Sequence, residues 1–406
     1  MSTPASTPRP RVLVTGASVA GPAAAYWLDR AGYDVTVLER APEPRRGGQN
    51  IDVRGLARDV LERMDLLDAV RDVGTGEVGT RFVDADGGTV SEFPTDDSTG
   101  DGPTAELEIL RGELARLLRE ACPDRVTWRH GDHVVDVDQD DASVTVSLER
   151  GGSESYDLLV VAEGPWSHTR GLVMTGDDEP DLERLGMYCA WATIPRTDDD
   201  DRWWRWMSVP GSRSVNLRPD NTGTTRAMLN FMTDETGLRE LSVDEQRAEL
   251  RERFADVGWE APRILDALDE ADDLYLDDLT QVRCPTWSRG RVVLLGDAAW
   301  CVTPIGGFGT SLALIGAYVL AAELSRASSP EAAFAAYEEW LRPLVDDVQD
   351  LPPGTPRLAN PRSRLGVALF NAGTRLAATG PVRALASRLG SGSSSDRELP
   401  DLVTDR

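Results

Sequence analysis

Lysine is absent from the 406-residue chain, so its 43 basic residues are all arginine. Without lysine there is no Schiff-base amine, no P-loop lysine and no ammonium donor for a catalytic step. Acidic residues number 69, and the formal net charge is −26. Such a charge repels nucleic acid and anionic membranes at long range, which argues against both as partners.

Cysteine, histidine and long apolar runs are scarce as well. The four cysteines are widely spaced, no Cys-x-x-Cys pair occurs, and there are only three histidines. A structural zinc site needs ligands at short spacing, so we expect no metal. The first ten residues lack the apolar core of a signal peptide, and no apolar run reaches the length of a membrane span. We therefore expect a cytoplasmic protein with reduced thiols.

Length and composition favour two domains, each with a buried core. A chain of 406 residues is long for one domain, and 40% of the residues are hydrophobic while 28% are charged. This composition is typical of a folded protein.

The amino-terminal segment has the pattern of the first unit of a dinucleotide-binding fold. Arg11–Thr15 predicts a short buried strand and Asp34–Leu38 a second one, with a glycine-rich turn and an alanine-rich helix between them. Glu39 ends the second strand. A strand, glycine turn, helix, strand and acid in this order indicate a site for a dinucleotide.

The glycine-rich turn suits a pyrophosphate. Gly16 permits a tight turn, and Gly21 permits close packing of the helix on the strand. The free N–H groups at the helix N-terminus favour a phosphate, and Glu39 stands where a carboxylate can accept the hydroxyls of a ribose. Ser18 replaces the usual middle glycine, but it is small and its hydroxyl can donate to a phosphate.

The middle of the chain, from about Asp177 to Thr280, predicts a separate lobe. Its alternating stretches indicate an antiparallel sheet: Gly186–Ile194, Trp203–Val209, Ser214–Arg218 and Thr225–Met232.

Several further elements follow from periodicity. A buried strand is expected over Arg291–Leu295 and a meander of three strands between Val126 and Leu148. Helices are expected over Arg54–Leu67, Val243–Asp256, Ala261–Leu268, Ser311–Leu324, Glu331–Val348, Arg362–Thr379 and Val382–Leu389.

Three separated motifs occur in one order along the chain. They are the glycine turn with Glu39, then Ala162-Glu163-Gly164, then Gly296-Asp297-Ala298-Ala299 followed by Pro304 and Gly306-Gly307-x-Gly309. Together they resemble the single-component (group A) FAD-dependent monooxygenases of the para-hydroxybenzoate hydroxylase fold. That family includes aromatic polyketide hydroxylases and tetracycline-inactivating monooxygenases, and the resemblance runs from about Val12 to Leu324.

The resemblance implies an α/β fold, with a Rossmann-like FAD-binding domain, an inserted antiparallel-sheet substrate domain and C-terminal helices. We expect the FAD-binding domain to comprise residues 1–80, 104–176 and 281–350. The substrate-binding domain is expected at 81–103 and 177–280, and a C-terminal helical segment at 351–406.

The resemblance also implies which residues hold FAD. Asp297 matches the aspartate that binds the ribityl and pyrophosphate region, and Arg111 matches an arginine that contacts FAD. The full expected set is Gly16, Ser18, Gly21, Glu39, Arg40, Arg46, Gly48, Asp52, Arg111, Glu163, Gly164, Gly296, Asp297, Pro304, Gly306, Gly307 and Gly309. Taken singly, Asp297 also suits a helix cap, the glycines suit turns and Arg111 suits a surface ion pair. Glu163 stands where the family usually has aspartate, in a motif that touches both FAD and the nicotinamide nucleotide.

The activity implied is oxygenation of an organic substrate with non-covalent FAD, NAD(P)H and O2 through a flavin C4a-hydroperoxide. Because the cofactor supplies this chemistry, no catalytic side chain is expected. A flavin-dependent halogenase of the same fold needs a lysine and is argued against by its absence. A reductase or dehydrogenase without oxygen transfer and a non-catalytic flavoprotein remain alternatives.

Seven side chains of the inserted lobe suit a planar, polycyclic substrate, because they are aromatic, thioether or amide groups. They are Met187, Trp191, Trp204, Trp206, Asn216, Met228 and Asn230. Each of them also suits the core of a sheet. On a strand, Trp204 and Trp206 share one face while Trp203 and Met207 share the other, and the sequence leaves open which face lines a pocket.

Overall fold

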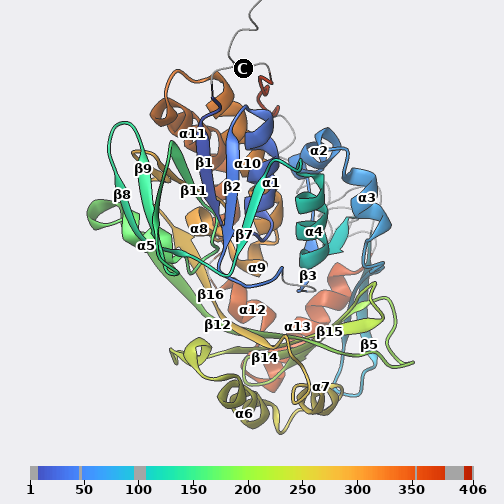
Figure 1. Cartoon of the computed structure of the whole chain (residues 1–406). Coiled ribbons are helices and arrows are strands. Elements are labelled where there is room, and N and C mark those ends of the chain that lie inside the picture. Colours follow the sequence, from blue (N-terminus) through green and yellow to red (C-terminus); the bar gives the residue numbers. More distant parts are fainter. Residues whose placement is uncertain (1–7, 45–47, 96–106, 353, 380–396, 405–406) are drawn as a thin grey trace, which may run out of the picture.

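Two sheets of different construction organise the chain. The computed structural model describes residues 8–44, 48–95, 107–352, 354–379 and 397–404. They form an upper lobe around a mostly parallel sheet and a lower lobe around a long mixed sheet (Figure 1).

The upper sheet has six strands, and its neighbours are parallel except at one edge. In spatial order the strands are β17 (Ser288–Arg289), β18 (Val292–Leu294), β11 (Leu158–Val161), β1 (Arg11–Thr15), β2 (Asp34–Glu39) and β7 (Thr127–His130). Only β17 runs antiparallel to its neighbour. Strands buried on both faces are continuous apolar runs, as β11 (LLVV) and β18 (VVL) are.

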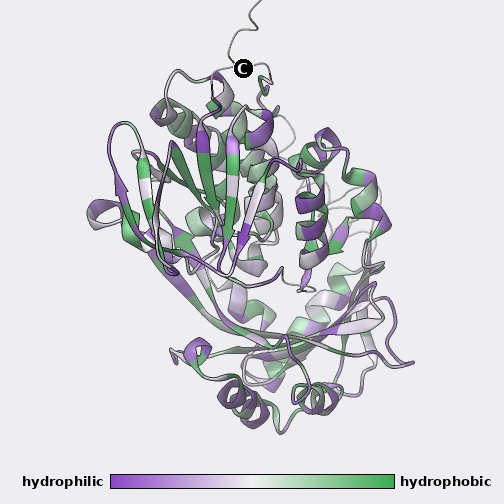
Figure 2. Cartoon of the chain, in the orientation of Figure 1, coloured by the Kyte–Doolittle hydropathy of each residue, from purple (hydrophilic) through white to green (hydrophobic). Residues whose placement is uncertain are grey.

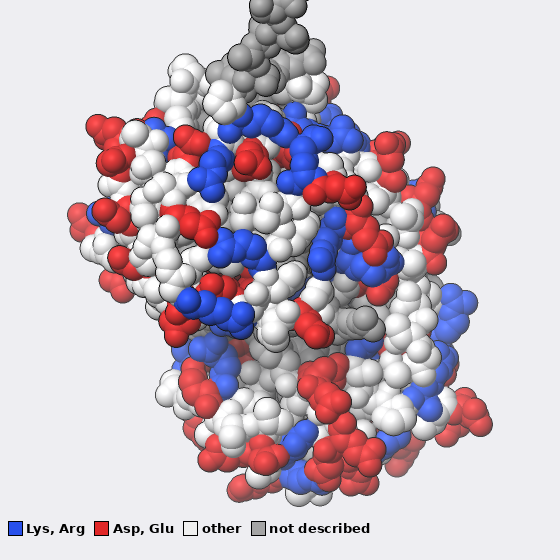
Figure 3. Space-filling model, viewed as in Figure 1, with Lys and Arg blue, Asp and Glu red and all other residues white. Residues whose placement is uncertain are grey.

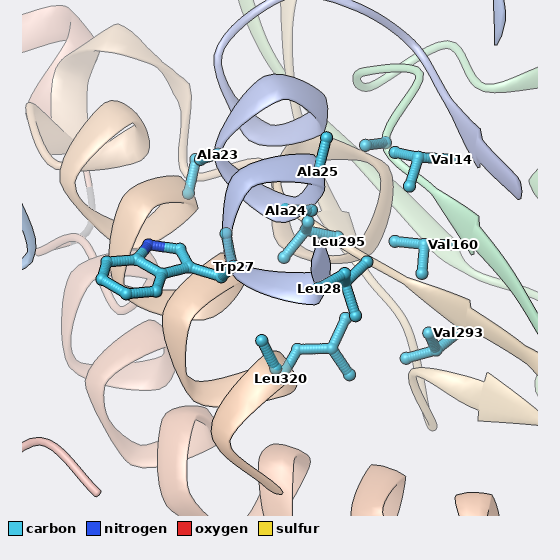
Figure 4. Packing of buried hydrophobic residues seen from close by; sticks show 14 of the residues in the cluster. Val14, Ala23, Ala24, Ala25, Trp27, Leu28, Val160, Val293, Leu295 and Leu320 are labelled. Carbon is cyan, nitrogen blue, oxygen red and sulfur yellow. The ribbon is translucent and has the colours of Figure 1, made fainter. Parts of the chain in front are cut away.

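Helices cover this sheet in layers. The helix α1 (Ala20–Arg30) packs on β1 and β2, α11 (Pro330–Gln349) contacts β17, and α10 (Gly309–Arg326) packs against both α1 and α11. Farther out, α2 (Leu56–Arg63) packs on α10, α4 (Arg111–Ala121) packs on α1, and α3 (Leu67–Asp72) contacts α2 and α4. The small side chains Ala23, Ala24 and Ala25 are fully buried and let α1 lie close to its neighbours (Figure 4). Trp27 packs edge-to-face on Tyr318 of α10, with ring centroids 4.8 Å apart. The N-termini of α1 and α10 are thereby held in one body.

The lower sheet has seven strands and two unlike faces. Its order is β16 (Tyr275–Arg283), β12 (Asp181–Pro195), β15 (Thr224–Met232), β14 (Arg213–Pro219), β13 (Trp204–Val209), β4 (Gly79–Val83) and β5 (Thr89–Pro94). Apolar residues of its lower face pack against α6 (Val243–Phe254) and α7 (Ala261–Ala267). The other face looks toward the upper lobe, with α12 (Thr355–Ala359) and α13 (Arg364–Ala377) between the two (Figure 1).

Short elements complete the chain. A three-stranded antiparallel sheet comprises β8 (Val134–Gln139), β9 (Val144–Leu148) and β10 (Ser153–Tyr156), and β3 (Asn50–Asp52) pairs with β6 (Glu108–Leu110). The remaining helices are α5 (His168–Val173), α8 (Asp297–Trp300), α9 (Thr303–Gly306) and the 3-10 turns η1 (Gly176–Asp178) and η2 (Leu238–Glu240).

The expected α/β class with an inserted sheet is confirmed. The inserted sheet is antiparallel except where β13 pairs with β4 in parallel, and some other elements also differ from expectation. The helix expected over Arg54–Leu67 is two helices, because Asp65 has a φ of 56° and breaks the run. The expected meander is divided, since β7 joins the parallel sheet, while β9 pairs with β8 on one side and with β10 on the other. The helix expected over Val382–Leu389 lies outside the described residues.

Surface character follows the same layering. Figure 2 shows hydrophobic residues along the central strands of the upper sheet and hydrophilic ones along α6. On the face seen in Figure 3, arginines and acidic residues are interspersed over both lobes. Within the described ranges, no helix combines the length and apolarity needed to cross a bilayer.

The contact between α1 and the glycine turn yields a stability prediction. A Cβ on Gly21 would lie 1.8 Å from the carbonyl oxygen of Gly16. We expect Gly21→Ala to lower the free energy of unfolding by about 3 kcal/mol, the upper range for forcing a carbon into a packed site. Urea unfolding followed by circular dichroism measures this.

Gly171 is the matched control, because it lies in α5 and a Cβ there meets no heavy atom within 4 Å. Gly171→Ala should leave stability unchanged or raise it by up to about 1 kcal/mol. Equal destabilisation of both variants would contradict the proposed clash at Gly21.

Candidate functional site

The glycine-rich turn lies where the carboxyl ends of β1, β2 and β11 meet. Gly16 has a φ of 96°, and a Cβ on it would lie 2.3 Å from the carbonyl oxygen of Ala162. Only glycine fits, and the turn brings the N-terminus of α1 over the sheet edge. This edge is where parallel α/β sheets bind nucleotides.

Glu39, at the end of β2, holds the turn in place. Its Oε2 accepts the N–H of Ala17 at 2.8 Å, and its Oε1 accepts the N–H of Ala41 at 2.9 Å. A carboxylate has about four acceptor sites. Glu39 therefore keeps capacity for ribose hydroxyls, and its contact with a ribose stays a prediction.

Three predicted residues from separate segments meet beside the turn. Arg111 donates from Nε to the hydroxyl of Ser18 at 3.0 Å, and its backbone N–H donates to the carbonyl of Gln49 at 3.0 Å. Gly48 has a φ of 95°, and a Cβ on it would lie 3.5 Å from Cβ of Arg111. An arginine and a serine hydroxyl together suit a phosphate.

Asp297 is the first residue of α8 and is half-buried at the same edge. Burial raises the pKa of its carboxyl, Asp277 raises it further, and the positive charge of Arg111 opposes both. A Cβ on Gly309 would lie 3.6 Å from Oδ1 of Asp297, so the carboxylate stands beside the first residue of α10. Gly296 has a φ of 65°, and a Cβ there would lie 3.0 Å from a side chain of α1.

The loop before α10 has open space in front of its backbone at Gly307, whereas a Cβ on Gly306 would lie 2.9 Å from Cγ1 of Val348. Pro304 and Gly306 lie in α9, and Gly309 begins α10. Gly307 has a φ of 68°, and a Cβ on it would meet no heavy atom within 4 Å. A flat ring could therefore approach this backbone directly.

β3 lies against the start of α10. Ser311 accepts the backbone N–H of Arg54 at 2.9 Å, and its hydroxyl donates to the carbonyl of Asp52 at 3.5 Å. Arg54 pairs with the Asp52 carboxylate at 2.9 Å and lies 5.9 Å from the ring centre of Phe308. Oδ1 of Asp52 is buried, with no hydrogen-bond partner in the described part of the chain. Sequence reasoning found Asp52 but missed Arg54 and Ser311, which carry no motif of their own.

Glu163 and Gly164 follow β11, and Glu163 caps the next helix. Its Oε2 accepts from the Ser167 hydroxyl at 2.7 Å and the Thr169 N–H at 3.0 Å, while Oε1 accepts from the Thr169 hydroxyl at 2.6 Å. Both oxygens are thus bound within the loop and α5. Gly164 has a φ of 85° and open space around its Cα.

Arg170 is a buried residue of α5, just after this loop, that the sequence analysis did not select. Its guanidinium donates to the carbonyl of Ala298 at 2.9 Å and to that of Pro165 at 2.8 Å. It therefore ties the loop to α8, one residue beyond Asp297. The signal available was its position seven residues after Glu163 in a polar run.

An open cavity of about 730 Å³ lies beyond the end of β2. Its lining residues are Arg40, Ala41, Pro42, Glu43, Pro44 and His133. Arg40 was predicted to contact the cofactor and lines this cavity next to Glu39. Arg46, also predicted, lies outside the described residues.

All seven residues predicted to contact substrate lie on one face of the lower sheet. We call it the upper face, defined by Met187, Trp191, Trp204, Trp206, Asn216, Met228 and Asn230. Strand pairing aligns Trp206 with Asn216, Asn216 with Met228 and Met228 with Trp191. Met207, by contrast, belongs to the apolar cluster with α6 and α7 on the lower face. The upper face meets the loop before α10 at Ile305, which packs with Met187.

The indoles of the upper face are tied to their neighbours. Trp204 and Trp206 stack with ring centroids 5.3 Å apart, and Trp204 donates from Nε1 to Oδ1 of Asn216 at 3.0 Å. Arg218 lies over the ring of Trp204, 4.2 Å from its centroid. Trp191 lies at the other end of the sheet, stacked on Tyr275.

Behind Trp204 lies a buried cluster of two carboxylates and one guanidinium. Arg218 pairs with Glu77 at 2.9 Å and also with Glu108, and the side chains of Glu77 and Glu108 are 0% and 4% exposed. Burial raises the pKa of Glu77 well above its usual range; Arg218 opposes this and Glu108 adds to it. The nearby carboxylate of Glu108 is a like charge, and it therefore adds to the effect of burial on the pKa of Glu77.

Metal ligands do not gather anywhere in the described ranges. No group of three or more His, Cys, Asp or Glu side chains there is arranged to hold a metal ion.

Comparison with known proteins places these features in a family. The family model described as an FAD binding domain matches residues 9–351. An uncharacterised protein of Mycobacterium tuberculosis is 40% identical, over 85% of this chain and 94% of that protein. The flavin-dependent monooxygenase eupH of Phoma sp is 38% identical, over 88% of this chain and 89% of its own length. The crystal structure of the tetracycline destructase Tet(51) matches with a TM-score of 0.80 and 30% identity, over 97% of this chain and 100% of that chain.

The buried acid predicts how stability depends on pH. The pKa of Glu77 is higher in the folded than in the unfolded chain, so its contribution is full below about pH 4.3, the ordinary glutamate value, and is lost as pH rises through the raised pKa. We expect Glu77→Gln to remove this loss. Urea unfolding at a series of pH values should show a smaller decline for Glu77→Gln than for the unchanged protein.

Glu113→Gln is the control, because Glu113 pairs with Arg116 on the surface of α4. It should leave the pH profile as it is. Parallel profiles for Glu77→Gln and the unchanged protein would contradict a raised pKa at Glu77.

Proposed function

The chain belongs to the FAD binding domain family and is an FAD-dependent monooxygenase, and on that premise we propose that it uses NAD(P)H and O2 to hydroxylate or otherwise oxygenate a planar aromatic or polyketide-like small molecule. We assign FAD binding to residues 1–80, 104–176 and 281–350. Substrate binding is assigned to residues 81–103 and 177–280, and residues 351–406 form a C-terminal segment.

The observation that carries this proposal is the convergence of two glycine-dependent backbones, the turn of Gly16 and Gly21 and the loop of Gly307. At Gly16 and Gly21 a Cβ would clash with backbone, so the turn and α1 stand closely packed. At Gly307 the space in front of the backbone is open. A packed pyrophosphate turn and an open loop at a helix N-terminus suit the two ends of one flavin dinucleotide.

We assign the residues by the chemistry that each part of FAD needs. Glu39 and Arg40 face the adenosine side, and Ser18, Arg111 and Asp297 surround the pyrophosphate and ribityl region. The backbone from Pro304 to Gly309 and the N-terminus of α10 are assigned to the flavin ring. When bound, FAD supplies the activation of O2.

The chain's own contribution is positive potential and shape. Lysine is absent, so negative charge on a reduced flavin must be met by backbone N–H groups, the α10 N-terminus and arginine. We assign Arg54 to this task, because its backbone N–H donates to Ser311 in the first turn of α10 and its guanidinium lies beside Phe308.

We assign the upper face as the substrate wall. It combines indole rings, thioethers and two amides, a mixture that binds flat ligands and fixes their orientation by a few hydrogen bonds. The similarity to a tetracycline destructase supports this substrate class, because the name of that protein gives a polycyclic compound as its substrate.

Three measurements test the proposal. The purified protein should carry about one FAD per chain, released by acid, because nothing in the assigned site requires a covalent link. NADPH should be consumed faster when a substrate from a panel of tetracycline, hydroxyanthraquinones and flavonoids is added, and product mass should rise by one oxygen. Substrate turnover without O2 and without a mass change would favour a reductase.

Gly307 tests the assignment of the flavin loop. We expect Gly307→Val to stay folded and to lose most of its FAD affinity, since the side chain would occupy the space assigned to the ring. FAD binding is followed by quenching of flavin fluorescence, and folding by circular dichroism.

Gly223→Val is the matched control, because Gly223 also has a positive φ, 82°, and open space around it, but lies in the turn between β14 and β15. It carries the same backbone strain with no ring to obstruct. Normal FAD affinity in Gly307→Val would remove this loop from the cofactor site.

A further inference from the structure

A buried guanidinium on the same side of the lower sheet as the upper face connects the two lobes. Arg218 donates from Nε to one oxygen of Glu77 at 2.9 Å and from Nη2 to the other at 3.2 Å, and Nη2 also donates to Glu108. The side chain of Arg218 is only 10% exposed. A planar guanidinium that is held at both Nε and Nη2 has little rotational freedom.

Glu108 is in turn fixed by β3 and the segment that follows α3. Asn50 donates from its amide to Glu108 and to the carbonyl of Pro219, and Thr75 donates its hydroxyl to Glu108 at 2.7 Å. Asn50 lies two residues before Asp52, which is assigned to the cofactor. The cluster thus joins the segment beside α10 to strand β14.

One face of the Arg218 guanidinium lies against a row of aromatic rings. Its guanidinium lies 4.2 Å from the centroid of Trp204, which stacks on Trp206. The ring centroid of Trp206 lies 5.8 Å from that of Phe82 in β4, and the ring centroid of Phe82 lies 5.5 Å from that of Phe370 in α13. The row therefore runs from a rigid ionic cluster along the upper face to the C-terminal helix.

We propose that Arg218 is a positioning residue: held by Glu77 and Glu108, its guanidinium fixes Trp204, and through it Trp206, in the orientation that a bound substrate meets. This rests on the proposed function, because it takes the upper face as the substrate wall. The guanidinium of Arg218 contacts Glu77, Glu108 and the ring of Trp204, so the proposed action is through the indoles.

Planarity and charge both matter for this role. An ammonium would keep the charge but offers neither the two-pronged grip on Glu77 nor a flat surface for an indole. Arg218→Lys therefore separates the ionic contribution from the stacking contribution. Arg218→Met removes both and leaves a side chain of similar reach.

Arg226 provides the matched control. It is aligned with Arg218 on the next strand, is equally buried at 9% exposure and pairs with the buried Asp220 at 3.1 Å. Its contacts are ionic and polar, with Asp220, Asp273 and Thr193. Arg226→Met removes a buried cation from the same face without touching the aromatic row.

The first measurement needs no substrate. Two stacked indoles couple their excited states and give a pair of opposite bands in the far-ultraviolet circular dichroism of the FAD-loaded protein. Trp287 and Trp300 form a second close pair that contributes to the same bands. We therefore take the difference between the circular dichroism spectra of the unchanged protein and of Trp206→Phe as the share of the Trp204–Trp206 pair. We expect Arg218→Met and Arg218→Lys to lose that share and Arg226→Met to keep it.

The second measurement uses tetracycline as the probe, with binding followed by flavin absorbance and by the fraction of NADPH electrons released as hydrogen peroxide. FAD affinity should stay within about twofold in both Arg218 variants, while tetracycline binding weakens by about tenfold, as expected for a lost stacked cation and a loosened ring pair.

The outcomes separate the two proposals. An intact indole signal in folded Arg218→Met overturns the positioning role, whatever tetracycline does. If Arg218→Met does not fold, Arg218→Lys, which keeps the charge, decides by the same signal. If Arg218→Met loses the indole signal but binds tetracycline and releases peroxide as the unchanged protein does, Arg218 does position the indoles. The upper face is then not the substrate wall. Loss of the signal in Arg226→Met as well would make the effect a general one of removing a buried cation, and would overturn the specific role.

Discussion

Between Gly16 and Gly21 the chain approaches itself so closely that one added carbon does not fit. This contact sets the angle at which α1 leaves the sheet, and α1 in turn packs along α10 through Trp27 and Tyr318. Because α10 begins beside Asp297 and the loop of Gly307, the two glycine-dependent backbones keep a fixed separation. A dinucleotide needs such a fixed distance between its phosphate and ring subsites.

The second organising feature is the division of labour between the faces of the lower sheet. Apolar residues such as Leu229 and Phe231 supply the core against α6 and α7, so the lower face carries the stability of the lobe. The upper face carries indoles, thioethers and amides between strands already held in register. Strand pairing therefore holds all of these side chains on one face of the sheet.

Sequence reasoning reached the fold class, the family and the motifs that depend on local physics. A glycine turn after a strand, an acid after the next strand and Gly296-Asp297 before an apolar helix are short-range patterns, and the structure brings Ser18, Gly48 and Arg111 together. Contacts between distant segments escaped it. The pairing of Arg218 with Glu77 spans 141 residues, and that of Arg170 with Ala298 spans 128, and no periodicity encodes either. The face on which Trp204 lies could be assigned only from the strand pairing. Side chains alternate between the two faces of a strand, but this alternation does not show which face is turned toward the other lobe.

The hydrogen bonds of Glu39 within the glycine-rich turn have a consequence for how the protein takes up its dinucleotide. Its carboxylate orders the turn through the N–H groups of Ala17 and Ala41, so the backbone that we assign to the pyrophosphate is held by contacts of the chain itself. Ordering a loop during association costs binding free energy, and here that ordering has been done by folding. The empty protein should consequently be a persistent, exchangeable species that takes up and releases its dinucleotide as a unit, rather than a chain that needs the cofactor as a template for its first strands.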